Sequence, residues 1–468
     1  MSARDRMSPV ELRASVSLAA IFGLRLLGMF IILPVFAIYA EQLPGGHDLT
    51  LVGIAIGAYG LTQAALQIPF GWWSDRYGRK PVIYVGLAIF AAGSFIAAAA
   101  ASIYLVIVGR VLQGAGAISA AVMAMAADLT REEHRTKAMA MIGSTIGLAF
   151  AFSLVASPWL AGLIGVPGLF AMTGALALAA MLVVWRVVPD IEETRRPSRG
   201  SALREFWHAL SDPQLARLNY GIFVLHAVLM SLFIVVPFSL RDAGLPLPGH
   251  WKVYLPAMLG SFVLMLPAVL GRSSAQRLKP VFIGSIAVLL AAHLALPWLA
   301  GGVASLTLFL LFFFTPFNVL EAMLPSLTSR LAPAHSKGIA IGLYSSVQFF
   351  GTFFGAAAGG FLYEHWGTTS VVIANAALLV IWIIAAAGMR PQGVLSLRTY
   401  SVPPLDAQQA QRLAARLQAL AGVREARVIA EERTASLMVD STAFDEHNVL
   451  QAIASQGELT WPQSTKSS

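Results

Sequence analysis

The sequence contains no cysteine among its 468 residues and carries little charge: 12% of the residues are Asp, Glu, Lys or Arg, whereas 57% are hydrophobic. Without thiols the chain cannot form disulfides, thiolate zinc sites or a cysteine nucleophile. Soluble globular chains carry roughly 25% charged residues, so half that share cannot cover a water-facing surface of this size. These two absences exclude an ordinary soluble enzyme and indicate that lipid is the solvent for much of the chain.

Twelve stretches are long and apolar enough to cross a bilayer, which takes about 20 mostly apolar residues per helix. The first is longer than the apolar core of a signal peptide, so we interpret it as a membrane helix. A polar connection, 189–215, divides the twelve into six and six. The stretches cover residues 15–40, 50–72, 81–101, 103–127, 138–163, 167–188, 216–240, 251–271, 280–299, 302–328, 338–363 and 367–388.

The dividing connection contains an apolar series at helical spacing, Leu203, Phe206, Trp207 and Leu210. Such an amphipathic helix either lies in the membrane interface or docks its apolar side on the bundle. The pattern does not decide between these two interpretations.

The positive charges are distributed unevenly along the chain. The whole formal net charge of +8 lies before residue 390, since the remaining tail is neutral. The N-terminus and the even-numbered connections hold 20 Lys and Arg residues, whereas the odd-numbered connections hold two, Arg241 and Lys252. Because cytoplasmic connections carry the excess of Lys and Arg, we expect both termini in the cytoplasm of a multi-pass protein of the bacterial inner membrane. Nucleic-acid binding is not expected, because it needs a basic face on a soluble domain.

A polar segment between the second and third stretches reads GWWSDRYGRKP, beginning at Gly71. Gly71 and Gly78 permit close approach and a tight turn. Arg79 can reach Asp75, and Asp128 ends the fourth stretch close to the same place, so these three side chains can form a charge-assisted latch. The plainer alternative is a positively charged loop with an incidental acid. The latch candidates are Gly71, Asp75, Arg76, Gly78, Arg79, Lys80 and Asp128.

This segment resembles the loop signature of the major facilitator superfamily, G-x-x-x-D-[RK]-x-G-[RK]-[RK]. The resemblance implies twelve helices in two six-helix halves, with substrate at the interface between the halves and transport by rocking of one half against the other. It also implies that the acid of the loop faces the start of the eleventh helix, near Gly338, where the helix dipole favours an anion. Such a contact favours the conformation that is open to the outside.

In the fourth stretch, residues 110–114 (RVLQG) are similar to a second motif of this family, R-x-x-Q-G. A buried arginine is costly in lipid and needs a cavity or a partner. The resemblance associates Arg110 with proton transfer; alternatively, backbone carbonyls and Gln113 satisfy it. A third motif, typical of antiporters, is degraded at residues 157–162, where Ser157 replaces the expected glycine.

Few ionisable residues lie deep inside the stretches. Glu321 is the one acid well within them, and His226 and Arg25 also lie at membrane depth. An acid there is by default a functional residue, so Glu321 is the first candidate for proton coupling, with Asn318 three residues earlier placed to orient it. His226 and Arg110 are further proton-coupling candidates. Structural alternatives stay open: a helix–helix pair for Glu321, a simple hydrogen bond for His226, and a carboxylate pair or an anion site for Arg25.

Other polar residues of the membrane stretches can line a cavity between the halves. Helix–helix hydrogen bonds account for each of them about as well. The cavity-lining candidates are Arg25, Tyr59, Gln63, Gln67, Gln113, Asn318, Tyr344 and Gln348.

After residue 390 the composition becomes that of a small soluble domain. A strand over 394–400, a helix over 405–420, a hairpin over 423–439 and a helix over 444–455 are predicted. This order, with a further short strand near Leu459, resembles the ferredoxin-like fold of heavy-metal-associated domains. Those domains bind metal through two cysteines, so we expect no metal site. The tail can instead dock on the bundle, self-associate, bind a cytosolic ligand or act as a passive appendage.

These observations predict an all-α membrane protein with an N half (1–188), a linker (189–215) and a C half (216–389), followed by a cytoplasmic α+β ferredoxin-like domain (390–468). We expect a secondary active transporter of a small molecule, coupled to protons and similar to drug/proton antiporters. The alternatives are a membrane sensor that signals through the tail and a proton-independent facilitator. The sequence shows no P-loop lysine signature and no Ser/His/Asp constellation, so we expect neither an enzyme nor a cofactor.

Overall fold

The structure is a computed structural model that describes residues 7–190, 202–270, 275–332, 337–389, 395–430, 433–440 and 444–454. The chain divides into two compact units. The membrane unit comprises Met1–Gly271 and Phe282–Gly388, and the tail unit comprises Arg272–Val281 and Met389–Ser468.

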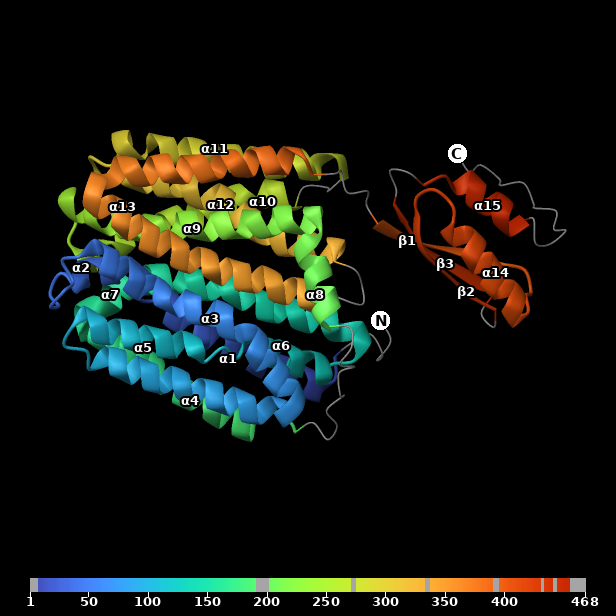
Figure 1. Cartoon of the computed structure of the whole chain (residues 1–468), viewed down its shortest axis with the longest axis horizontal. Coiled ribbons are helices and arrows are strands. Elements are labelled where there is room, and N and C mark those ends of the chain that lie inside the picture. The colour runs from blue at the N-terminus through green and yellow to red at the C-terminus, as the bar shows by residue number, and fades with distance from the viewer. Residues whose placement is uncertain are drawn as a thin grey trace. The chain divides into compact units, whose positions relative to one another are not determined.

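The membrane unit is built from long helices that lie side by side with nearly parallel axes (Figure 1). Polar side chains fix several helix starts: Ser8, Asp48 and Asp212 accept hydrogen bonds from backbone N–H groups in the first turns of α1, α3 and α9. The helices are α1 (Pro9–Phe30), α2 (Leu33–Ala40), α3 (Leu49–Tyr77), α4 (Arg79–Ala98), α5 (Ile103–Ala115), α6 (Ser119–Asp128), α7 (Glu132–Arg186), α8 (Ala202–Ser211), α9 (Pro213–Asp242), the 3-10 turn η2 (Leu247–Gly249), α10 (Trp251–Leu270), α11 (Ala275–Leu299), α12 (Val303–Leu331) and α13 (Lys337–Ala387).

In the part of the chain that the structure describes, ten helical segments are long and apolar enough to cross a membrane. Two of them are unusually long: Glu133–Arg186 has 54 residues and Lys337–Ala387 has 51. Each is kinked at a glycine with a φ of 70°, Gly165 in α7 and Gly367 in α13, a conformation that other residues rarely adopt. Because the backbone of each glycine is not helical, each segment consists of two helices of about 20 or more residues, and each of these is long enough for one pass.

Helix α8 forms within the predicted linker and lies across the axes of the long helices (Figure 1). Ala209 is buried in a cluster with residues at the end of α12 and the start of α13, including Ala332. Trp207 and Leu210 stay exposed on the same helix. The helix therefore docks on the bundle by one side and offers apolar side chains to its surroundings on another; the side chain of Leu203 lies outside the described residues.

The tail unit contains a three-stranded antiparallel sheet and two further helices. Strand β3 lies between β1 and β2, with Leu397 opposite Met438 and Ala426 opposite Leu437. The order of elements agrees with the prediction, but the expected closing strand near Leu459 lies outside the described residues. The elements are β1 (Leu395–Ser401), α14 (Ala407–Gln418), β2 (Val423–Ile429), β3 (Thr434–Asp440) and α15 (Glu446–Ala454).

Candidate functional site

The N half and the C half meet at one end of the membrane unit, where α2 ends and α3 begins; we call it the far end. There α3 and α13 approach so closely that glycine is required. A Cβ added to Gly53 would lie 2.2 Å from the Ala356 carbonyl oxygen, and one added to Gly57 would lie 2.9 Å from Phe353 Cα. The far end is therefore closed by direct backbone contact between the halves.

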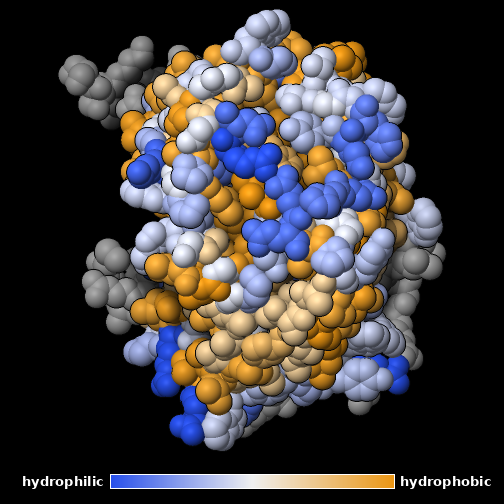
Figure 2. All heavy atoms as spheres, turned by 90° about the vertical axis from the view of Figure 1, so that its left-hand side faces the viewer, coloured by the Kyte–Doolittle hydropathy of each residue, from blue (hydrophilic) through white to orange (hydrophobic). Residues whose placement is uncertain are grey.

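Two polar contacts also join the halves at the far end. Arg241 of α9 donates from Nη1 to Glu41 Oε2 at 2.8 Å. Thr50 donates from its backbone N and from Oγ1 to Glu364 Oε2, each at 2.9 Å. Thr50 lies in the first turn of α3, where free N–H groups and the helix dipole favour a carboxylate. Figure 2 faces this end and shows hydrophilic residues gathered over part of it.

Away from the far end, the halves separate around a cavity of about 180 Å³. Along the α3–α13 pair, a Cβ on Gly60 would still lie 2.6 Å from the Phe349 carbonyl oxygen, whereas Gln67, seven residues later, lines the cavity. A Cβ on Gly342 would meet nothing within 4 Å. The gap thus widens toward the end that carries residues 71–81, which we call the loop end. The polar lining residues are Gln67, Ser119, His226, Glu321, Thr328, Tyr344, Ser345 and Gln348.

The C-half side of the cavity brings together three predicted residues from three helices. Gln348 of α13 donates from Nε2 to Glu321 Oε1 of α12 at 3.4 Å and contacts His226 Nε2 of α9 at 2.9 Å. The amide nitrogen is a donor, so His226 Nε2 accepts and the other ring nitrogen donates to the Ile222 carbonyl at 3.3 Å. His226 Nε2 lies 3.9 Å from Glu321 Oε2. The histidine and the acid therefore share one amide partner.

Asn318 does not orient Glu321, contrary to expectation. Its Nδ2 donates instead to Ser261 Oγ of α10 at 3.0 Å. The spacing of three residues places both side chains on roughly one face of α12, but that face borders two neighbouring helices. Asn318 therefore connects α12 to α10.

The N-half side of the cavity has its own polar network around the buried Arg25. Arg25 donates from Nη1 to Ser119 Oγ at 2.8 Å and from Nη2 to Gln63 Oε1. Gln63 in turn donates to Gln67 Oε1 at 3.0 Å. The partners of Arg25 in the described residues are an amide, a hydroxyl and the face of Tyr59, whereas the carboxylate pair left open by the sequence is not among them. Gln67 and Ser119 form the cavity side of this network.

Arg110 is bonded to backbone carbonyls and to Gln113, which is the structural alternative to a role in proton transfer. It donates to the carbonyl oxygens of Ala55 and Ile56 at 3.3 and 3.1 Å and to Gln113 Oε1 at 2.9 Å. Its guanidinium carbon lies 5.1 Å from the centre of the Tyr59 ring. Arg110 therefore fastens α5 to α3 inside the N half. Three of the cavity-lining candidates border the described cavity: Gln67, Tyr344 and Gln348. The candidates that do not line it are Arg25, Tyr59, Gln63, Gln113 and Asn318.

The latch residues come together at the loop end. Arg79, at the start of α4, donates from Nε to Asp128 Oδ2 at 3.0 Å and from Nη1 to Ser74 Oγ at 2.7 Å, and Nη1 also pairs with the Asp75 carboxylate. Gly78 has a φ of 96°, which permits the turn between α3 and α4. The structure thus places Arg79 between two carboxylates, all within the N half.

Other signature residues have different partners. Lys80 pairs with Asp190 at 2.7 Å, and Arg76 lies 5.6 Å from the centres of the Trp72 and Tyr77 rings. A Cβ on Gly71 would lie 3.3 Å from Ala120 Cβ on α6, the close approach expected at that position. Among the described residues, the ion-pair partner of Asp75 is Arg79 rather than a group at the start of α13.

Comparison with known proteins places this arrangement in a family. A model of the Major Facilitator Superfamily matches residues 18–356. The chain belongs to the major facilitator superfamily. The inner membrane transport protein YajR of Escherichia coli (strain K12) is 42% identical over 450 residues, which cover 96% of this chain and 98% of that protein. Multidrug resistance protein 2 of Bacillus subtilis is 24% identical over 72% of this chain and 86% of that protein.

Solved structures of transporters share the fold of this facilitator. A D-xylose-proton symporter superposes with a TM-score of 0.64 at 14% identity and covers 81% of this chain and 98% of that chain. A bacterial homolog of the human lysosomal transporter Spinster, inward-facing and occupied, gives a TM-score of 0.62 at 15% identity over 81% of this chain and 96% of that chain. At these identities the likeness shows the fold alone.

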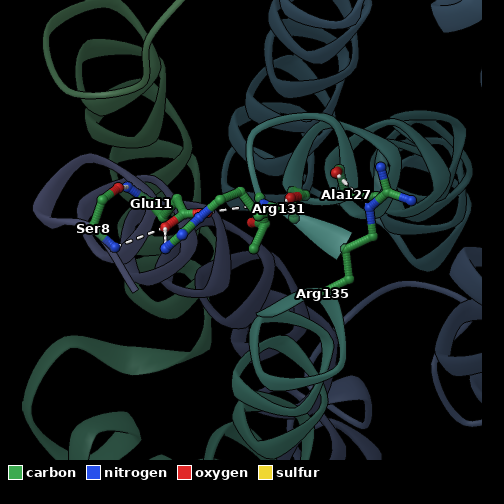
Figure 3. A network of polar contacts seen from close by, with 7 residues as sticks. Ser8, Glu11, Ala127, Arg131 and Arg135 are labelled. Carbon is green, nitrogen blue, oxygen red and sulfur yellow. Dashed lines mark hydrogen bonds and ion pairs between the residues drawn. The ribbon is translucent and has the colours of Figure 1, made fainter. Parts of the chain in front are cut away.

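An ion pair at the loop end of this facilitator's N half was not predicted from the sequence (Figure 3). Both carboxylate oxygens of the buried Glu11 accept from Arg131, from its backbone N and Nε at 2.9 Å and from Nη2 at 3.0 Å. The hydrogen bond to Glu11 raises the pKa of Arg131. Arg135 donates to the Ala127 carbonyl at 3.1 Å nearby. The capping box that Ser8 forms with Glu11 signals the start of α1, but no pattern signals a partner 120 residues away.

Proposed function

We propose that this facilitator is a proton-coupled secondary transporter that carries a small molecule across the bacterial inner membrane by alternating access. The observation that carries the proposal is the cavity between the halves, closed at the far end and bordered by Glu321, His226 and Gln348. Membership of the family supports transport. Similarity to YajR, named an inner membrane transport protein, supports the location.

We place twelve passes in the membrane with both termini in the cytoplasm. Ten membrane-length segments supply the passes if the two longest each cross twice, turning at Gly165 and Gly367. The concentration of Lys and Arg in the N-terminus and the loop-end connections supports a cytoplasmic loop end. The structure then corresponds to the inward-facing state.

Proton coupling is assigned to Glu321 and its two partners. A carboxylate is costly at membrane depth, so protonation of Glu321 allows the cavity to close without a buried charge. The proton is held at Oε2, which has no hydrogen-bond partner among the described residues and faces His226 Nε2. When the proton leaves, the Gln348 N–H donates to the carboxylate and His226 is free to take up charge. Arg110, bonded to carbonyls and Gln113, has a structural role in this scheme.

Reconstitution of the full chain in proteoliposomes tests the proposal. Drugs, sugars, amino acids and organic cations are screened for movement with and without a pH gradient. Glu321→Gln should abolish accumulation driven by the gradient and leave exchange without a gradient intact. His226→Gln should weaken coupling, whereas His293→Gln should not, because His293 is equally buried but packs against Phe309 and Phe313 away from the cavity. If the flux of every transported compound is the same with and without the pH gradient, proton coupling is contradicted and a proton-independent facilitator is favoured.

The latch is proposed to set the balance between the two conformations. In this structure the halves are apart at the loop end, and the side chain of Asp75 is one-third exposed and paired with Arg79. When the halves close at the loop end, its carboxylate would face the start of α13 near Gly338, where the helix dipole favours an anion. The latch of Asp75, Arg79 and Asp128 would then stabilise the outward-facing state.

The tail unit is proposed to be a ferredoxin-like interaction module in the cytoplasm. The sheet order β1-β3-β2 and the helix after β1 and after β3 agree with that fold. Self-association and binding of a cytosolic ligand are two interactions that such a module can offer. Analytical ultracentrifugation of the full chain and of a chain ending at residue 390 distinguishes them, because only self-association changes the oligomeric state.

A further inference from the structure

The amide groups beside Arg25 have a fixed orientation. A guanidinium has donors only, so the Gln63 group that it meets is the oxygen, Oε1. Gln63 must then present Nε2 to Gln67, which accepts through Oε1 at 3.0 Å. The charge of Arg25 thus determines the orientation of both amides, and it leaves Gln67 Nε2 as the last group of the chain.

Two donors at the end of this network face the cavity without an acceptor. Gln67 Nε2 is buried and has no hydrogen-bond partner among the described residues. Ser119 Oγ accepts from Arg25 at 2.8 Å and from Gln63 at 3.3 Å, which leaves its hydroxyl proton to be donated. Both residues line the cavity, and Gln67 is 1% exposed. A buried donor without an acceptor is costly, so these groups point to a ligand atom that accepts from both.

We propose that Gln67 Nε2 and Ser119 Oγ form a substrate subsite for an oxygen acceptor, a carboxylate or an amide carbonyl. Both donors are polarised by the positive charge of Arg25, which lies one hydrogen bond behind Ser119 and two behind Gln67, and this strengthens the bonds that they donate. The subsite rests on the proposed function, because it treats the cavity as the transport site.

The other lining residues and the cavity volume indicate the size and polarity of the rest of the substrate molecule, which we call its body. Phe22, Phe30 and Phe349 border the same cavity, so the body is apolar and suited to aromatic contact. The volume of about 180 Å³ is near that of a cavity of about 150 Å³ that holds benzene, and it is below the roughly 300–1,000 Å³ of drug-sized pockets. The substrate class is therefore a small amphiphile with about one ring and a short acceptor-bearing arm.

Three probes with one phenylpropyl body test the subsite on the full chain in lipid nanodiscs: 3-phenylpropionate, 3-phenylpropanamide and 3-phenylpropylamine. The first two carry an anionic and a neutral acceptor, and the protonated amine carries none. Gln67→Leu should weaken binding of the propionate and the propanamide about tenfold or more and leave the amine unchanged. A larger loss for the propionate identifies a carboxylate as the preferred acceptor, and equal losses identify the carbonyl oxygen common to both.

Two further variants separate recognition from folding. Gln67→Glu keeps the acceptor for Gln63 and places an acceptor in the cavity, so it should weaken the propionate most. Thr173→Val is the matched control: Thr173 is as buried as Gln67 but does not line this cavity, and its hydroxyl donates to the Phe170 carbonyl at 2.8 Å, so all three affinities should stay unchanged. Loss of affinity for all three probes in Gln67→Leu, an unchanged affinity for all three, or no binding to the unaltered protein overturns the subsite.

The two proposals fail in different ways. If flux responds to the pH gradient through Glu321 while Gln67→Leu changes no probe affinity, the subsite falls and the proposed function stands. If Gln67→Leu discriminates among the probes while no compound is transported, the subsite stands and the proposed function falls.

Discussion

The two ends of the membrane unit are held by different kinds of contact. At the far end, backbone touches backbone at Gly53, and the ion pair of Glu41 with Arg241 crosses between the halves. At the loop end, the ion pairs of Arg79 with Asp128 and of Arg131 with Glu11 each stay inside the N half. Under the proposed mechanism, the difference teaches that the far-end contacts break during transport, whereas the loop-end pairs keep the N half rigid while it moves.

The absence of cysteine makes this comparison measurable, because introduced cysteines are the only sites of labelling. Spin labels at Gln42 and Pro246 report the distance between the halves at the far end; we call them the far-end pair. Labels at Tyr77 and Lys337 report it at the loop end and form the loop-end pair. All four positions are exposed.

The largest effect is expected from Gly53→Ala. The added Cβ would collide with the Ala356 carbonyl oxygen, so α3 and α13 could not meet. Overpacking of this kind costs about 1–3 kcal/mol, and the closed far-end population should fall about tenfold or more in the far-end distance distribution. Gly284→Ala is the control, because a Cβ there meets nothing within 4 Å. An unchanged far-end distance in Gly53→Ala would show that the close contact of α3 with α13 at Gly53 does not close this end.

A smaller effect in the opposite direction is expected from Asp75→Asn. Loss of the charge weakens the proposed contact with the start of α13, so the state closed at the loop end should fall about fivefold, which corresponds to about 1 kcal/mol. The loop-end pair should then sample shorter distances less often. Asp190→Asn serves as the control, because Asp190 is largely exposed and pairs with Lys80 rather than with Arg79. Identical distance distributions in the two variants would remove the latch from the account.

A still smaller effect is expected from Glu41→Gln. The ion pair with Arg241 is 36–41% exposed, so it contributes about 1 kcal/mol or less and weakens in salt. The far-end pair should shift by about two- to fourfold toward open distances at low salt and by less at high salt. Asp242→Asn removes the other acid beside Arg241 but no contact between the halves, and it should leave the distances unchanged. A shift in the far-end distance that does not depend on salt would contradict an electrostatic contribution of the Glu41–Arg241 pair.

Deletion of residues 391–468 is expected to change neither distance distribution. A transporter with an appended interaction module should retain flux in proteoliposomes without its tail. Abolished flux with both distances intact would instead favour a sensor whose output passes through the tail.

Contacts that are local in sequence were predictable from the sequence, and so was the pair of Arg79 with Asp128, because the second and fourth stretches end at the same side of the membrane. Other distant contacts were not predictable. The pairing of Arg79 with Asp75 is a one-turn contact inside a recognisable loop, so spacing alone suggests it. Glu11 with Arg131 and Glu41 with Arg241 join residues 120 and 200 positions apart, and no periodicity encodes which helices become neighbours.

For the same reason, the sequence predicted the ionisable residues at the cavity but not their partner. Membrane depth singles out Glu321 and His226 because a charge there is costly. Spacing along α12 then suggested Asn318 as a partner, but Gln348 from another helix takes that place. The twelve apolar stretches were visible in the sequence, and the breaks expected between residues 163 and 167 and between 363 and 367 fall at Gly165 and Gly367, whose backbone angles are not helical.

Measurement of both label pairs in the unaltered full chain, in lipid nanodiscs as the pH is lowered, tests the central claim most directly. Protonation of Glu321 should redistribute the two states, so the loop-end distance should shorten in the same fraction of molecules in which the far-end distance lengthens. Distances that stay fixed, or that lengthen or shorten together, would contradict alternating access in this protein.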